Sequence, residues 1–274
     1  MKERFPTKLK EAFMKIRLGK VEEGIKIMNE VKGLEAKKAI AMAELAYFQH
    51  DWAKGLELSC SFLPSTEACH YSNIYDEHFA MIILASYHTD AWDKTEKFLK
   101  DLLKGLQKLK KDDQPEQRMF QIKQKLSWIK NKAATMKAYK EKPKPRTKGK
   151  SIEEIVKQQE EYKPKLNNKP IEKADYILYF LNLYGKTEDF IKVYENAGEG
   201  VDYLNHERAA HEYMALGDIK GAQKTLLICA KNWWPVEHMQ VEPVALMTEN
   251  TLLPALTKDI CLKIIKTPKG QTSI

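Results

Sequence analysis

The stretch YGKTEDFIKVY, residues 184–194, repeats much of LGKVEEGIKIM, residues 18–28. Both copies have Gly, Lys, Glu, Ile and Lys at the same positions. Around the first copy, apolar residues recur at helical spacing from Leu9 to Ile16, and again from Val21 to Met28. Between the two patterns stands Gly19, and glycine readily takes the left-handed conformation that ends a helix. The stretch therefore predicts two helices joined by a tight turn.

The same arrangement returns elsewhere in the chain. LGDIKGAQKTL at 216–226 and YFQHDWAKGLELS at 47–59 have comparable turns, and SYHTDAWDKTEKFL at 86–99 is a looser copy. A pattern repeated at intervals of this length favours stacked repeat units. The alternative is one irregular helical domain. We expect five helical hairpins, near residues 7–32, 38–63, 76–106, 172–196 and 205–231.

Small residues stand where the two helices of a hairpin would meet. The last hairpin has Ala210, Gly217-Asp218-Ile219 and Ala222; the others show Ala12 with Gly24 and Ala43 with Gly55. In this respect the sequence resembles the tetratricopeptide (TPR) repeat family. The hairpin at 172–196 departs from the pattern, because Leu178 and Phe190 fill its small positions. We expect that hairpin to pack less closely or in a shifted register.

The resemblance implies an all-α, right-handed superhelix that binds a protein or peptide on its concave face. The first helices of the repeats would line that face, with Phe13, Lys15, Glu44, Tyr47, Tyr176, Tyr179, Glu207 and His211 as candidate contacts. The carboxylate clamp by which some family members hold chaperone tails is not visible at the matching positions. The expected function is a non-enzymatic scaffold or regulator, bacterial in type, such as an immunity-type protein that neutralises a partner.

Positive charge is concentrated in the middle of the chain. The net charge is +8, yet Lys104 to Lys150 contains sixteen basic and four acidic residues, so the remainder is mildly acidic. Met119, Ile122, Leu126, Ile129, Ala133 and Met136 predict one long helix after an N-cap at Asp113, with a narrow apolar seam and a basic outer side. KEKPKPRTKGK, residues 140–150, predicts an extended linker. A solvated surface is the simpler interpretation. The segment could instead bind an anionic membrane surface or a nucleic acid, and nucleic-acid binding is the alternative function.

Motifs for catalysis or metal binding are weak. HERAAH, residues 206–211, places its histidines five apart and so on different sides of a helix. Cys60, Cys69, His70 and His78 lack paired zinc-ligand spacing. No phosphate-binding loop or nucleophile elbow occurs, so we expect no cofactor, no metal and no enzyme. A helical hydrolase with a metal site is a third, less favoured hypothesis.

The remaining segments complete the predicted organisation. The N-terminal hairpins occupy 1–110, the basic helix and linker 111–170, the C-terminal hairpins 171–232, and a capping segment 233–274. Trp233 and Trp234 are candidate anchors for a partner, because tryptophan is enriched at interaction hot spots. The four cysteines are scattered, and no apolar run follows the charged N-terminus. We therefore expect reduced thiols, no signal peptide, no membrane span and a cytoplasmic location.

Overall fold

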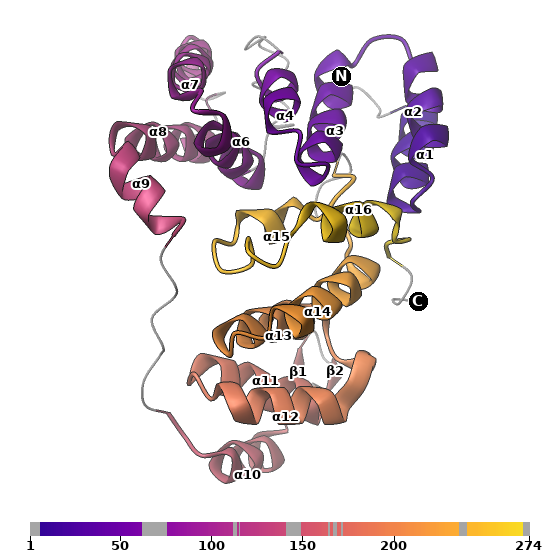
Figure 1. Ribbon diagram of the computed structural model, residues 1–274, viewed down its shortest axis with the longest axis vertical. Helices are drawn as coiled ribbons and strands as arrows, with labels where there is room; N and C mark the ends of the chain where they lie inside the picture. Colours follow the sequence, from indigo (N-terminus) through magenta and orange to yellow (C-terminus); the bar gives the residue numbers. More distant parts are fainter. Residues whose placement is uncertain are drawn as a thin grey trace.

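The computed structural model describes residues 6–61, 76–111, 114, 116–140, 149–163, 165–166, 169–170, 172–235 and 240–270. Fifteen α-helices lie in these ranges, together with a short 3-10 turn and a two-residue strand pair (Figure 1). The all-helical fold class expected from the sequence is confirmed. No helix in the described ranges has the length and apolar character needed to cross a membrane.

The five expected hairpins are all present as neighbouring helix pairs. The N-terminal hairpins are α1 (Thr7–Arg17) with α2 (Val21–Glu30), α3 (Glu35–Phe48) with α4 (Trp52–Ser59), and α6 (Asp76–Thr89) with α7 (Trp92–Gln107). The C-terminal hairpins are α11 (Lys173–Leu183) with α12 (Thr187–Ala197), and α13 (Tyr203–Ala215) with α14 (Ile219–Asn232). Figure 1 shows the two groups at opposite ends of the molecule.

The turn of each hairpin has one residue in the left-handed conformation. Gly19, Gly185 and Gly217 have φ angles of 76°, 65° and 77°. In the second and third hairpins this place is taken by His50 and Asp90, at 58° and 54°. These equivalent positions explain the repeated phrase: the shared glycine marks a helix end and a reversal of direction.

Small residues let the helices of a hairpin approach closely. A Cβ atom on Gly24 would lie 2.5 Å from Ile16 Cγ1 and 2.7 Å from the carbonyl oxygen of Ala12. Gly55 faces the ring of Tyr47 in the same way. Phe190, which stands at the position matching Gly24, is fully buried and packs in a separate core with Leu178 and Tyr194.

The basic segment departs from the single long helix predicted. The helix is interrupted at Asn131, whose φ and ψ are −102° and 42°, so that α8 (Glu116–Lys130) is followed by α9 (Lys132–Ala138). The break lets Lys132 reach Asp90 with an N–O distance of 2.6 Å. Asp113, the expected N-cap, and most of the expected linker lie outside the described residues. Next come α10 (Ile152–Tyr162), with a capping box at Ser151, and the antiparallel pair β1 (Lys165–Leu166) and β2 (Lys169–Pro170).

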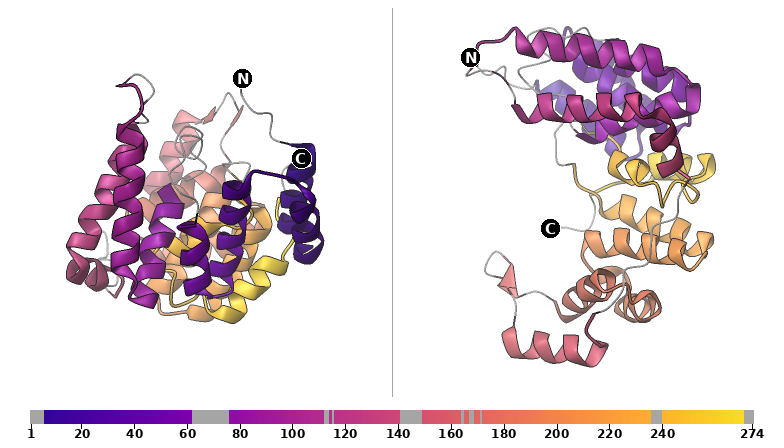
Figure 2. Two further views of the ribbon diagram at one scale, coloured as in Figure 1. Left: turned by 90° about the horizontal axis from the view of Figure 1, so that it is seen from above. Right: turned by 90° about the vertical axis from the view of Figure 1, so that its left-hand side faces the viewer.

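Residues 240–270, here called the C-terminal segment, lie between the two groups of hairpins. This segment contains α15 (Val244–Thr248) and α16 (Lys258–Lys266), and Figure 1 and the right-hand view of Figure 2 show it between the two groups. Its apolar side chains, including Val241, Leu246 and Ile264, share one core with the N-terminal hairpins and with one side of α13 and α14. The segment covers apolar surface, as a cap would, but it does so inside the molecule.

Candidate functional site

Phe13 and Tyr47, two of the candidate contacts, lie in the core. Both are completely buried. The hydroxyl of Tyr47 is 2.7 Å from Ser59 Oγ, which places the ring between α3 and α4. Lys15 is partly exposed and pairs with Glu23 at 2.7 Å on the neighbouring helix. None of these three side chains therefore offers an open contact surface for a partner.

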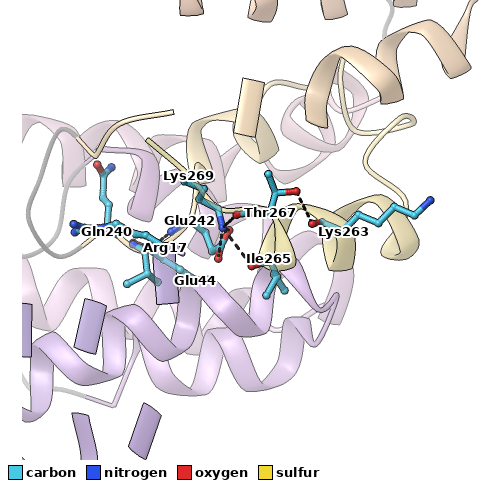
Figure 3. A network of polar contacts seen from close by, with 9 residues as sticks. Arg17, Glu44, Gln240, Glu242, Lys263, Ile265, Thr267 and Lys269 are labelled. Carbon is cyan, nitrogen blue, oxygen red and sulfur yellow. Dashed lines mark hydrogen bonds and ion pairs between the residues drawn. The ribbon is translucent and has the colours of Figure 1, made fainter. Parts of the chain in front are cut away.

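Glu44 contacts a peptide segment, and that segment belongs to the same chain. Its Oε2 accepts hydrogen bonds from the backbone N–H groups of Val241 and Glu242, at 2.7 and 2.9 Å. Arg17 Nε donates to the carbonyl oxygen of Gln240 at 2.8 Å (Figure 3). The side of α1 and α3 that was expected to receive a partner is thus covered by the C-terminal segment.

Lys269 completes the polar network in Figure 3. Its ammonium donates to Glu242 Oε1 at 3.2 Å and to the carbonyl oxygens of Thr267 and Ile265 at 3.3 and 3.4 Å. Burial raises the pKa of Glu242 to about 8, although the nearby Lys269 acts in the opposite direction. Lys269 N–H also donates to the carbonyl oxygen of Arg17 at 2.9 Å, so both ends of the C-terminal segment meet the first hairpin.

Glu207 and His211 face the turn that follows α15. His211 Nδ1 lies 2.5 Å from Thr251 Oγ1, and burial lowers the pKa of His211 to about 4. Burial also raises the pKa of Glu207, with a further contribution from the charge of Glu249. His211 is therefore also occupied by the C-terminal segment, and Glu207 interacts electrostatically with Glu249 of that segment.

Tyr176 and Tyr179 remain on an open surface. Tyr179 is 45% exposed, and Leu183, one turn further along α11, is 40% exposed. On α13 the guanidinium carbon of Arg208 lies 5.0 Å from the centroid of the Tyr179 ring, and Leu204, one turn earlier, is 51% exposed. We call the surface formed by Tyr176, Tyr179, Leu183, Leu204 and Arg208 the α11–α13 face.

Polar contacts fix the position of α11 against α13 beneath this face. Asn205 Nδ2 donates to Asp175 Oδ1 at 2.8 Å, and Asn182 Nδ2 donates to Glu212 Oε1 at 2.7 Å. Arg208 Nη1 donates to Asn205 Oδ1 at 2.8 Å. The Arg208 guanidinium is therefore held in place over Tyr179.

The two tryptophans lie in different environments. Trp233 is buried, while Trp234 is 53% exposed. A Cβ atom on Gly270 would lie 3.3 Å from the Trp234 indole, so one side of that ring rests on the end of the C-terminal segment. Of the pair, Trp234 is the one that a partner could reach.

The histidines and cysteines do not assemble a metal site in the described part of the chain. No group of three His, Cys, Asp or Glu side chains suitable for a metal ion is found there. In HERAAH, His206 Nδ1 lies 2.8 Å from the hydroxyl of Tyr194, whereas His211 contacts Thr251. Cys60, Cys229 and Cys261 are free thiols, and Cys69 and His70 lie outside the described residues.

Several residues of these sites were missed by sequence reasoning. Leu183 could have been found from its one-turn spacing to Tyr179, whereas Arg208 and Leu204 on α13 were not identified from the sequence. Arg17, Gln240, Glu242 and Lys269 gave no local signal, because their partners are distant in the sequence; Arg17 and Gln240 are 223 residues apart.

The comparisons with known proteins give no relative. No protein-family model matches the chain, and neither a curated protein nor a solved structure shows significant similarity to it.

Proposed function

We propose that this protein is a non-enzymatic, TPR-like scaffold that binds a protein or peptide partner on the α11–α13 face. The observation that carries the proposal is the preformed pair of Tyr179 and Arg208, flanked by exposed leucines on two adjacent helices. Tyrosine and arginine are among the residue types that most often dominate interface energies. Binding that neutralises the partner, as in immunity-type proteins, is one form that this function can take.

The chemistry of the face defines the kind of partner. Leu183 and Leu204 favour apolar side chains, and Arg208 favours a carboxylate, which it can bind with two parallel hydrogen bonds. We expect the partner to present an acidic residue flanked by apolar residues. The stacked ring of Tyr179 supports the guanidinium in the orientation that this recognition needs.

The test is affinity capture from cell extract with wild-type protein and the double variant Tyr179→Ala/Arg208→Ala, followed by mass spectrometry. The matched control is Met14→Ala/Lys220→Ala, which removes one exposed apolar and one basic side chain on other helices. We expect a protein that the wild type and the control enrich and the double variant does not. Circular dichroism should show equal helix content for all three. Equal enrichment by the double variant, or no enrichment at all, would contradict the proposal.

A further inference from the structure

The helices α8 and α9 carry a one-sided charge. From Gln117 to Lys140 there are seven basic residues and no acidic residue. The whole of this stretch is described, and it forms the outer layer of the N-terminal hairpins next to α7 (Figure 2, right).

Some of these basic residues have structural roles. Lys125 is buried, with its ammonium 3.9 Å from the centroid of the Trp128 ring. Lys132 pairs with Asp90 and also lies over the ring of Trp92 at 5.3 Å. Lys132 thereby joins α9 to the hairpin of α6 and α7, whereas the contact of Lys125 with Trp128 lies within α8.

Lys123 and Lys130 have no such role. Both are exposed, and no hydrogen bond or ion pair joins either of them to the described part of the chain. They are seven residues apart on one side of α8, which separates them by about 10.5 Å along the helix axis. The same side has Phe120, which is 66% exposed, and exposed uncharged polar residues, namely Gln117, Gln124, Ser127 and Asn131.

On other helices of this protein, some exposed lysines pair with a glutamate about one turn away. Lys100 on α7 pairs with Glu96, Lys157 on α10 with Glu161, and Lys54 on α4 with Glu57. Such pairs one turn apart are the ordinary arrangement on solvated helices. From Gln117 to Lys140 no carboxylate stands among the basic side chains, and the exposed Glu116 comes just before this stretch, which leaves a positive potential for an anionic partner.

We propose that the outer face of α8 and α9, centred on Phe120, Lys123 and Lys130, binds the phosphate backbone of a nucleic acid. Lysines and uncharged polar side chains are the usual contacts to phosphate and sugar oxygens. A duplex carries about one charge per 1.7 Å of its axis, so both lysines can meet phosphates at once.

A nucleic acid fits this face better than a membrane surface does. A helix that lies in a membrane interface needs an exposed apolar side. In α8 that side, with Ile122 and Ile129, is buried against the fold, and Phe120 is the large apolar side chain left exposed.

The test measures binding of short fluorescent duplex DNA, duplex RNA and single-stranded DNA by anisotropy at several salt concentrations. The full-length wild type is compared with Lys123→Gln/Lys130→Gln. The charge-matched control is Lys192→Gln/Lys224→Gln, which neutralises two exposed lysines on α12 and α14. Loss of two phosphate contacts should lower the slope of log K against log salt by about 1.8 for duplex DNA. Affinity near 0.1 M salt should fall by roughly ten- to a hundredfold.

The three nucleic acids identify the form that is preferred. A preference for single strands that Phe120→Ala reduces would indicate that bases stack on the Phe120 ring. If Phe120→Ala leaves the affinity for duplexes unchanged, the contacts are to the backbone. Either result supports the proposal. Absence of binding at low salt, an equal loss in the control, or binding to anionic vesicles in place of nucleic acid would overturn it.

Discussion

Lys269 Nζ lies 3.1 Å from Glu242 Oε2, and neither side chain has any exposed surface. The pair joins the residues just before α15 to those just after α16, and Glu242 is also linked through its backbone N–H to Glu44 on α3. Its loss should therefore loosen the C-terminal segment from the N-terminal hairpins.

Lys269→Met should lower the free energy of unfolding by about 3 kcal/mol, because it leaves a buried carboxyl group without its partner. Lys266→Met, a change at an exposed position of α16, should stay within about 0.5 kcal/mol of the wild type. Urea denaturation of both variants measures the difference. Similar losses for the two would show that the contact between Lys269 and Glu242 makes no special contribution.

Glu242 should make stability fall as the pH rises from about 5 to about 8. Its pKa in the folded state is raised to about 8, so the folded chain holds a proton that the unfolded chain releases near its ordinary pKa. This stabilisation is complete at a pH below the pKa that Glu242 has in the unfolded chain. It is lost as the pH rises through the pKa that Glu242 has in the folded chain. Glu242→Gln should flatten the slope between pH 6.5 and 8 in thermal melts. An unchanged slope would exclude Glu242 as its source.

His211 should act in the opposite sense at lower pH. Its pKa falls to about 4 in the folded state, so the unfolded chain takes up a proton first as the pH drops below about 6.5. Stability is thus retained above pH 6.5 and lost toward pH 4. His211→Gln should reduce this loss, measured by denaturant midpoints across that range. His78, whose pKa is also lowered to about 4, should leave part of the slope in place.

Gly24→Ala tests the close contact inside the first hairpin. Helix propensity alone would make alanine more stable by about 1 kcal/mol. The added Cβ would overlap with Ile16 and with the backbone of Ala12, so we expect a net loss of about 1 to 3 kcal/mol. Gly200→Ala, where no atom lies within 4 Å of the added Cβ, is the control and should not be destabilised. A stabilised Gly24 variant would contradict this account of the packing.

The helices could be predicted from the sequence, but their mutual arrangement could not. Apolar spacing around Gly19, Gly185 and Gly217 located the hairpins because helix ends and packing seams are local features. Local spacing does not reveal which distant segment covers a helix. Glu44 and Val241 are 197 residues apart, so the occupation of this face by the C-terminal segment had no readable signature.

The candidate site was predictable to the same limited extent. Tyr179 was named because it stands in a first helix of a hairpin, and it is exposed beside Arg208. Phe13 and Tyr47 were named for the same reason, yet both are buried, because the repeat pattern does not separate the outer from the inner side of a helix. The break at Asn131 was missed because a single asparagine in a charged helix is a weak stop signal.

Two adjacent alanines on α13 divide the interior of this protein. Ala210 packs in the core that contains the C-terminal segment, and Ala209 packs in the smaller core of α10, α11 and α12. Each core can therefore lose its order as a cooperative unit of its own. Heating should then release α10 to α12 as an early melting unit, and hydrogen exchange should detect this while the amides of Val241 and Glu242 stay protected.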